Sequence, residues 1–383
     1  MRRRDFIKSS AASLVLLSSM PASGFWLSDK KRLSKTQNKV IWVFLRGAMD
    51  GLSALAPTAD PDFKKYREAY YQGDKTPLLP LSSGFALDPN LSFFHQSFLA
   101  KELSAVVAVA SAYRKRSHFD AQDQMESGLD DTNHESGWLA RALSVSEGQA
   151  LAIAHTTPIA LKGGQVPHTW YPSSLDKVDD DLLKRLKDMY QNDSLLLPNI
   201  TAAISQSSNE SMMSKSKKRA NFTTLASECG RLLSSDQNLR CAMLEMGGWD
   251  THNNQKNRLS RQFTQLNDGM ENLKDSLGSD WENTLVFIST EFGRTVAMNG
   301  TKGTDHGSAS TMFVLGGALK HKNQLLSGGQ VYGQWLGLAQ LLQGRDLMPS
   351  SDIRYWLSRG LQMHWGLKQA QINQVFPDLP PLA

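Results

Sequence analysis

Residues 40–45 read Val40-Ile41-Trp42-Val43-Phe44-Leu45, and Arg46-Gly47-Ala48-Met49-Asp50-Gly51 follows them directly. Six apolar residues in an unbroken run are typical of a strand that is buried on both faces of a parallel sheet. The polar and glycine residues that follow indicate that this strand ends in a loop, with Asp50 near its carboxyl end. The stretch therefore predicts a sheet that is covered by helices.

The rest of the chain alternates between apolar runs and helical periodicity. Further buried strands are predicted at 105–110, 239–246 and 284–289, and helices at 61–71, 221–233 and 255–277. Strands separated by helices predict an α/β fold with a largely parallel central sheet and helices on both faces. Sheets of this kind place their functional sites at the carboxyl ends of the strands.

The N-terminus has the layout of a twin-arginine (Tat) export signal. The charged stretch Arg3-Arg4-Asp5-Phe6-Ile7-Lys8 precedes an apolar run at 11–17 and the small residues Ala22-Ser23-Gly24. The apolar run is too short to span a bilayer core of ~30 Å, so no stable membrane anchor is expected after cleavage. We predict a Tat signal peptide at 1–24, the Tat machinery as a partner, and a periplasmic or extracellular location.

Most of the excess basic charge lies outside the predicted domain. The chain has a formal net charge of +5, but residues 41–383 hold 33 bases and 35 acids. This near-neutral balance gives no support to a nucleic-acid partner. Residues 25–39, which include Lys39, are predicted to be a solvated basic linker between the signal and the domain.

The remaining chain is long enough for a single large domain. We predict one α/β domain at 40–383 with an insertion around 170–220, because residues 205–218 are polar and repetitive. The chain has only two cysteines, Cys229 and Cys241. They leave two alternatives open, which are one disulfide in an oxidising compartment and two buried thiols.

Charged and imidazole side chains follow the predicted strands or lie in a glycine-rich turn. These residues are Asp50, Asp250, His252, Glu291, Arg294, Asp305 and His306. Because the carboxyl ends of parallel strands meet at one edge of a sheet, we expect these side chains to converge there. Carboxylate oxygens mixed with imidazole nitrogens suit zinc, manganese or a related divalent metal.

The order of these motifs resembles the alkaline phosphatase and sulfatase superfamily. An Asp follows the first strand, then come an Asp/His pair, a long helix, a strand ending in Thr-Glu-Phe-Gly, and Asp-His-Gly. More closely, the chain resembles DUF1501, a Tat-exported branch with no assigned reaction. That resemblance is carried by Phe44-Leu45-Arg46-Gly47, Ser117-His118-Phe119 and the segments 246–252, 290–295, 303–307 and 329–333. It implies an alkaline phosphatase-like fold for nearly the whole mature chain.

The resemblance also implies which residues bind metal. Similarity to the superfamily gives Asp250, His252 and His306 to one ion, and Asp50 and Glu291 to a second. A departure is that Phe292 stands where the superfamily has an imidazole. The second site could therefore be weak, empty or completed by Asp305, so one or two ions are expected. The chain also lacks the Cys/Ser-x-Pro-x-Arg segment from which the formylglycine of sulfatases is made.

Ser117 is the candidate nucleophile that the resemblance implies. The nucleophile of the superfamily is a Ser or Thr that opens a helix after a strand, where backbone N–H groups favour an anion. A metal or His118 would have to activate its hydroxyl. Ser117 with Asp120 also fits a capping box, which is a purely structural alternative.

Two functions are consistent with the sequence. One is metal-dependent hydrolysis of a phosphate or related anionic ester outside the cytoplasm, with Arg46, Arg116 and Arg294 able to clamp a small anionic substrate. The other is a non-catalytic envelope protein of the same fold, with a degraded metal site, that binds a ligand or partner. The joint presence of five metal-ligand candidates favours the enzyme, whereas the missing imidazole at Phe292 favours the binding protein.

Overall fold

The computed structural model describes residues 37–71, 76–172, 185, 187–191, 193, 197, 221–321 and 323–379. By its internal contacts the chain divides into two units. The larger unit contains Thr36–Ile153, Thr157–Pro167 and Asn221–Ala383, and the smaller contains Met1–Lys35, Ala154–Thr156 and His168–Ala220, with the short strand β7 (His168–Thr169). The predicted signal peptide at 1–24, most of the linker at 25–39 and most of the insertion around 170–220 lie outside the described residues.

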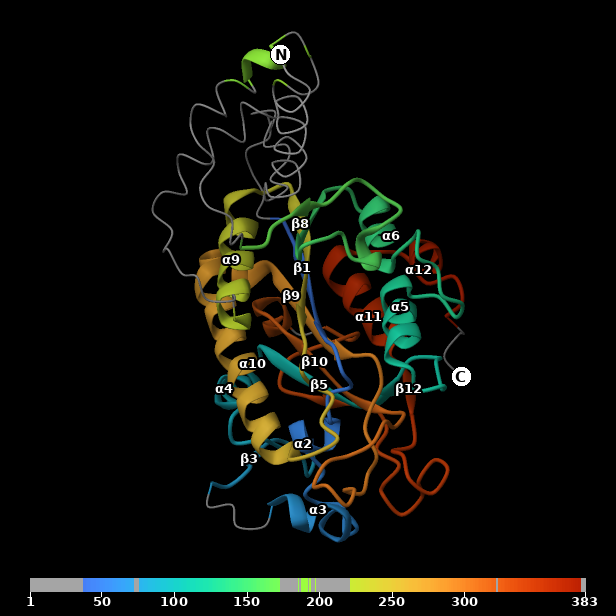
Figure 1. Cartoon of the computed structure of the whole chain (residues 1–383). Helices are drawn as coiled ribbons and strands as arrows, with labels where there is room; N and C mark the ends of the chain where they lie inside the picture. The colour runs from blue at the N-terminus through green and yellow to red at the C-terminus, as the bar shows by residue number, and fades with distance from the viewer. Residues whose placement is uncertain are drawn as a thin grey trace. The chain divides into compact units, whose positions relative to one another are not determined.

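A mixed, mostly parallel sheet forms the centre of the larger unit (Figure 1). Its strands lie in the order β11-β5-β10-β9-β1-β8-β6, with β12 beside β5. The bounds are β1 (Lys39–Leu45), β5 (Leu103–Ala110), β6 (Gln149–Ile153), β8 (Leu239–Met246), β9 (Thr284–Thr290), β10 (Ser310–Leu315), β11 (Val331–Tyr332) and β12 (Ser351–Asp352). The four predicted strands are present and the predicted α/β fold class is confirmed.

β1 lies at the middle of the sheet and is buried along its whole length. It runs parallel to both β8 and β9, its two neighbours. The strand begins at Lys39, a residue that the sequence analysis assigned to a solvated linker. That assignment is wrong, because Lys39 is fully buried and its Nζ donates to the Leu239 carbonyl at 3.1 Å and lies 3.7 Å from Asp280 Oδ2. A buried ammonium is tolerated where it finds acceptors of this kind.

Helices cover both faces of the sheet (Figure 1). α9 (Phe222–Ser235) and α10 (Gln255–Leu277) pack together on one face, and α5 (His118–Ser127), α6 (Trp138–Ser144), α11 (Ile353–Trp365) and α12 (Gln369–Val375) lie on the other. The apolar positions that recur along α10 are buried, as their helical spacing predicts. None of the helices that the structure describes is both long enough and apolar enough to span a membrane.

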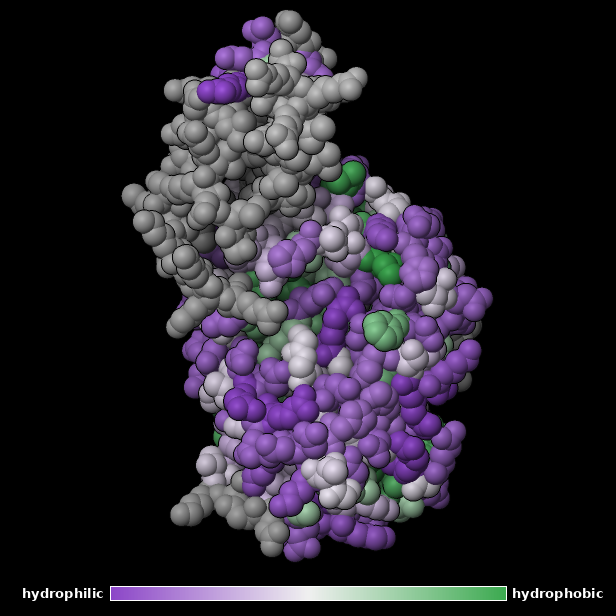
Figure 2. Space-filling model, viewed as in Figure 1, coloured by the Kyte–Doolittle hydropathy of each residue, from purple (hydrophilic) through white to green (hydrophobic). Residues whose placement is uncertain are grey.

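The remaining elements are short. They are α2 (Gly51–Ala54), α3 (Phe63–Tyr71), α4 (Ser92–Leu99), the 3₁₀ turns η1 (Ile159–Leu161), η3 (Gly278–Asn283) and η4 (Gly317–Lys320), and a small antiparallel sheet of β2 (Leu55–Ala56), β4 (Ala86–Leu87) and β3 (Leu79–Pro80). Figure 2 shows that the described surface on this side is mainly hydrophilic, with apolar side chains standing singly. Single apolar side chains are ordinary on a protein surface and need no partner to explain them.

The direction of β10 brings a fifth segment to the carboxyl edge of the sheet. β10 is antiparallel to β9 and also to β5, so β1, β5, β8 and β9 all end at the same edge, and β10 begins there. The turn that carries Asp305 and His306 precedes β10 and therefore lies at this edge as well. The expected convergence of segments at one edge follows directly from this topology.

The two cysteines are free and buried. Cys229 lies in α9 and Cys241 lies in β8. Burial raises the pKa of both thiols, so neither is a thiolate at neutral pH. Of the two alternatives left open by the sequence, the structure has the pair of buried thiols.

Candidate metal centre

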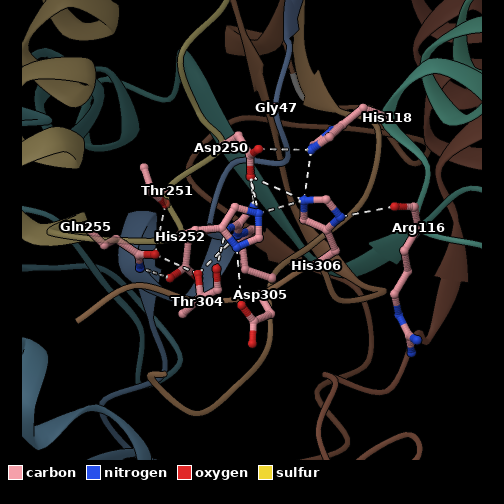
Figure 3. A network of polar contacts seen from close by, with 12 residues as sticks. Gly47, Arg116, His118, Asp250, Thr251, His252, Gln255, Thr304, Asp305 and His306 are labelled. Carbon is pink, nitrogen blue, oxygen red and sulfur yellow. Dashed lines mark hydrogen bonds and ion pairs between the residues drawn. The ribbon is translucent and has the colours of Figure 1, made fainter. Parts of the chain in front are cut away.

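Three imidazoles and one carboxylate converge at the carboxyl edge of the sheet (Figure 3). His118 opens α5, Asp250 and His252 follow β8, and His306 precedes β10. His306 Nε2 lies 3.0 Å from the Nε2 atoms of both His118 and His252, and 3.3 Å from Asp250 Oδ1. Among the residues that the structure describes, His118, Asp250 and His306 are the one group of three or more His, Cys, Asp or Glu whose ligand atoms lie within 4.8 Å of one another.

Each of these imidazoles is held from behind through its Nδ1 atom. The contacts are His118 Nδ1 to Glu291 Oε1 at 2.7 Å, His252 Nδ1 to Asp305 Oδ1 at 3.2 Å, and His306 Nδ1 to the Arg116 carbonyl at 3.1 Å. A carboxylate or carbonyl oxygen can only accept a hydrogen bond, so each Nδ1 is the atom that donates. A neutral ring then keeps its lone pair on Nε2, which is the nitrogen that faces the other ligands.

This donor set fits a divalent metal ion. Zinc binds imidazole nitrogen at about 2.0–2.1 Å, so nitrogens on one tetrahedral ion stand ~3.3 Å apart. The separation of 3.0 Å between the Nε2 atoms of His118 and His306 is close to that value, and His252 Nε2 lies 3.0 Å from His306 at the side of this group. Imidazole nitrogens together with a carboxylate suit zinc, manganese or a related divalent metal. The residues present therefore fit the kind of metal centre expected from the sequence.

Arg294 orients Asp250. The Arg294 side chain is fully buried, and its Nη1 donates to Asp250 Oδ1 at 2.6 Å while its other nitrogens donate to the hydroxyl and carbonyl of Thr304. Burial opposes the charge of Asp250, but hydrogen bonds from His118, His306 and Arg294 hold the pKa of this carboxyl well below its usual range. Arg294, a predicted clamp for the substrate, is thus placed behind a candidate metal ligand.

Glu291 lies behind His118 and does not face the other ligands. It is fully buried, and its Oε1 accepts from Gly47 N at 2.8 Å and Gln122 Nε2 at 2.9 Å as well as from His118. Burial would raise its pKa, but these hydrogen bonds, led by that from His118, lower it. Asp305 holds the equivalent position behind His252, so the structure places both acids as partners of ligands.

Asp50 lies outside the cluster of imidazoles. It caps the N-terminus of α2, accepting from Leu52 N at 3.2 Å, and forms a buried ion pair with Arg67 at 2.5 Å. Ser53 and Gln255 also donate to its carboxylate. Burial opposes ionisation, but Arg67 lowers the pKa of Asp50. Because Asp50 is engaged here and Glu291 by His118, the structure does not bring together the second pair of ligands that the resemblance implies.

Ser117 is the N-cap residue of α5, where the sequence places it. Its side chain makes no capping hydrogen bond, so the capping box with Asp120 does not form, and Asp120 instead accepts from the Tyr113 hydroxyl at 2.9 Å. The preceding Arg116 has a φ of 60°, in the left-handed region that costs a non-glycine residue ~1 kcal/mol or more. Its carbonyl is the group that accepts from His306 Nδ1, so the strained residue helps to position a candidate ligand.

His118 is the ligand that the sequence analysis did not assign. The sequence analysis gave it only as a group that could activate Ser117. The length of the loop between β5 and α5 does not indicate how close the start of α5 comes to the ends of the other strands. The signal that could have found it is an imidazole in the first turn of a helix that follows a strand of the parallel sheet. Arg46, a second of the three predicted clamps, lies between the carboxylates of Glu126 and Glu245 at 2.5 Å and 2.6 Å.

The family described as Protein of unknown function (DUF1501) matches residues 112–353. The chain belongs to this family. The matched range includes His118, Asp250, His252 and His306, and so the whole candidate centre. The resemblance to DUF1501 is therefore confirmed. No curated protein matches the chain.

Several solved structures are similar to the chain at low sequence identity. Ps i-CgsB in complex with k-i-k-neocarrahexaose is 10% identical with a TM-score of 0.44, over 88% of this chain and 74% of that one. Alkaline phosphatase from the Antarctic bacterium TAB5 is 13% identical with a TM-score of 0.36, over 90% and 99%. The lipoteichoic acid synthase LtaP from Listeria monocytogenes is 9% identical with a TM-score of 0.41, over 94% and 78%.

Proposed function

We propose that this protein is a metal-dependent hydrolase of a phosphate or related anionic ester that acts outside the cytoplasm after Tat export. The observation that carries the proposal is the convergence of three Nε2 atoms on Asp250, with every ligand fixed by a partner behind it. The side chains of Asp250 and His252 are 41% and 43% exposed, so a substrate can reach the centre from solvent. An open centre with oriented ligands is typical of catalytic metal sites.

We assign the residues of the centre different roles in hydrolysis. His118, Asp250, His252 and His306 hold the divalent ion, which when bound would polarise the ester and stabilise the charge that develops. Ser117 lies next to His118 at the N-terminus of α5, where backbone N–H groups favour an anion. Since its hydroxyl does not cap the helix, we assign Ser117 as the attacking group.

A binding protein without catalysis is the second candidate, and Phe292 favours it. Its ring stacks on His118 with centroids 4.9 Å apart and lies 5.2 Å from His306. Phe292 is buried with Ala48 and Ala121, so an apolar side chain fills the space next to the centre. One ion beside an apolar wall suits a ligand-binding site as well as a hydrolase.

Turnover by the purified mature protein tests the hydrolase against the binding protein. We expect hydrolysis of at least one member of a panel of phosphomonoesters, phosphodiesters and sulfates, together with bound metal. Asp250→Asn and His306→Ala should each abolish both, while His134→Ala, at an exposed histidine outside the centre, should change neither. Metal-loaded wild type that binds an anionic ligand but hydrolyses no ester supports the second candidate, and hydrolysis that survives both variants contradicts the proposed site.

Ser117→Ala tests the attacking group. The variant should lose turnover while keeping its metal and its thermal stability, because the hydroxyl contributes no capping bond that could be lost. Ser146→Ala is a matched control, because Ser146 follows α6 and its hydroxyl donates to the Ala142 and Leu143 carbonyls within that helix. Full activity in Ser117→Ala would show that another group attacks.

Export is tested by replacing the twin arginines. Arg3→Lys with Arg4→Lys keeps the charge but removes the guanidinium pair that the Tat receptor reads, so the precursor should stay in the cytoplasm. The control is Lys30→Arg with Lys31→Arg in the predicted linker, which should leave export unchanged. Cell fractionation gives the result, and normal export of the arginine variant would contradict the Tat assignment.

A further inference from the structure

The arginines around the centre differ in how fully their charge is neutralised. Arg46 contacts two carboxylates, so that group carries a net negative charge. Arg294 contacts one carboxylate, that of Asp250, and the two charges cancel. Neither of these guanidinium groups has positive charge left for a substrate.

A third group of charged side chains, around Asp346, has more arginines than carboxylates. Asp346 is fully buried, and its carboxylate accepts from Arg116 Nη2 at 2.7 Å and from Arg345 Nε at 3.0 Å. The Ser308 hydroxyl also donates to this carboxylate, at 2.9 Å. Two guanidinium groups share this single buried carboxylate, which fixes both of them in place, and the exposed Asp305 carboxylate offsets only part of the charge of Arg345.

This arginine pair lies directly beside the candidate metal centre. Arg116 accepts from His306 Nδ1 through its carbonyl, and Arg345 Nη2 donates to the His306 carbonyl at 2.6 Å. Figure 3 shows that the Arg116 guanidinium points away from the three imidazoles, while its carbonyl faces His306. The positive groups therefore stand next to the metal ligands and not among them.

The pair also has access to solvent. The side chains of Arg116 and Arg345 are 25% and 42% exposed. Arg116 Nε has no hydrogen-bond partner among the residues that the structure describes, but this atom is buried, so a ligand meets the exposed part of each guanidinium group. The neighbouring Lys115 is exposed and adds a further positive charge. Planar guanidinium donors of this kind match the oxygens of a phosphate, sulfate or carboxylate.

We propose that Arg116 and Arg345 form a subsite for a second anionic group of the substrate. The substrate is then an anionic ester whose remaining part carries a further phosphate, sulfate or carboxylate close to the bond that is hydrolysed. This inference rests on the proposed hydrolase, and it names the class of substrate that the same site takes. The role of Arg116 and Arg345 is to position and select the substrate, since Arg345 contacts His306 only at its backbone carbonyl and Arg116 contacts it through its own carbonyl.

Two phosphonates that cannot be hydrolysed test the subsite by binding alone. Phenylphosphonate carries one anionic group, and 4-carboxyphenylphosphonate carries the same group with an added carboxylate. Isothermal titration calorimetry of the zinc-loaded wild type should show about tenfold tighter binding of the second compound, because one more ion pair forms. Arg116→Gln and Arg345→Gln should each remove most of this preference, and each should weaken binding of the carboxylate compound more than binding of phenylphosphonate.

Control variants separate the subsite from general charge and from folding. Arg231→Gln removes an exposed arginine on α9 and should keep the full preference. Lys115→Gln should reduce it only slightly, because a flexible lysine with no fixed partner contributes mainly long-range attraction. Metal content and thermal unfolding of each variant are measured first, and Arg345→Gln gives an independent test where Arg116→Gln proves unstable.

The outcomes distinguish the subsite from the hydrolase on which it rests. Binding of phenylphosphonate with no preference for the carboxylate compound overturns the subsite and leaves the hydrolase standing. A preference that persists in the double variant Arg116→Gln with Arg345→Gln also overturns the subsite. Binding of neither phosphonate to the zinc-loaded wild type contradicts the hydrolase itself, and the subsite fails with it.

Discussion

β1 and β9 carry a polar cluster at each of their two ends, and the two clusters behave in opposite ways. At the amino ends, His364 is buried with Nε2 at 3.0 Å from the Lys39 carbonyl and 3.1 Å from the Asn283 carbonyl. Burial lowers the pKa of His364 to about 4. At the carboxyl ends, partial burial opposes the charge of His118, but hydrogen bonds to Asp250 and Glu291 raise its pKa to about 9.

The difference between His364 and His118 indicates which histidines of this fold can bind a metal. His364 uses its Nε2 proton on backbone carbonyls, so the ring is a closed structural element with no lone pair aimed at another side chain. His118 uses Nδ1 on Glu291 and directs Nε2 toward His306 and Asp250. The imidazole at the amino edge is thus satisfied by backbone carbonyls, whereas the Nε2 atoms at the carboxyl edge face other side chains.

The largest effect on stability is expected from breaking the buried ion pair between Asp50 and Arg67 near the carboxyl edge. Arg67→Leu leaves Asp50 buried without its partner, which should lower the free energy of unfolding by about 3–5 kcal/mol. Metal affinity should stay the same, because Asp50 lies outside the cluster of imidazoles. Urea unfolding of the metal-free protein measures the first quantity, with Arg231→Leu at an exposed position as the control. Loss of metal at unchanged stability would instead make Asp50 a ligand.

The two histidines are compared directly by truncating each. His118→Ala removes one of four candidate ligands and should weaken metal binding by at least about a hundredfold, roughly 3 kcal/mol, because structural zinc sites bind with about 10–16 kcal/mol in total. His364→Ala should lower stability and leave metal affinity unchanged. Competition titration with a chromophoric chelator measures the affinities. Equal affinities in the two variants would remove the distinction between the two edges.

The pH dependence of stability tests the role of His364 at the amino edge of the sheet. The pKa of His364 is lowered from 6.5 to about 4 in the folded state, so the unfolded chain takes up a proton in this range that the folded chain does not. The contribution of His364 is therefore full above pH 6.5 and is lost as the pH falls toward 4, by up to about 3 kcal/mol. We expect His364→Gln to have a flatter profile than wild type between pH 6.5 and 4. Parallel profiles measured by urea unfolding would contradict this role.

The smallest effect is expected at the acids behind the imidazoles. Glu291→Gln and Asp305→Asn should each weaken metal binding by about 10–100-fold, as partners of metal-binding histidines do. The loss of metal affinity should be closer to ~100-fold for Glu291→Gln, because Glu291 is fully buried and lies 2.7 Å from His118 Nδ1. It should be smaller for Asp305→Asn, because the Asp305 side chain is 56% exposed. Chelator competition at fixed pH measures both variants. A larger loss in Asp305→Asn would reverse the assigned order.

Much of the fold could be predicted because its signals are local. An unbroken apolar run identifies β1, and the recurring apolar positions of 255–277 identify α10. The predicted boundary at Lys39 failed, because an ammonium reads as solvated until a distant carboxylate and carbonyl are known to surround it. Such partners lie hundreds of residues away and leave no trace in the local pattern.

The candidate site was predictable in composition but not in arrangement. Asp250, His252 and His306 were expected together, and the structure brings them together with His118. Glu291 and Asp50 were expected to share an ion, but each carboxylate has other partners. A carboxylate that binds metal and one that orients a metal ligand cannot be told apart in the sequence. Their roles differ according to which hydrogen-bond donor or metal ion lies next to the carboxylate in the folded protein.

The sequence by itself determined the fold class, the edge of the sheet at which polar residues gather, and the residue types available there. These follow from hydrophobic periodicity and from the rule that parallel strands end at one edge. Only the tertiary structure decided which nitrogen of each imidazole faces the centre, which acids stand behind, and which arginines keep free charge. Those properties depend on hydrogen bonds between residues far apart in the chain, such as His306 with Arg116 and Arg345, and on the distances that packing sets between them.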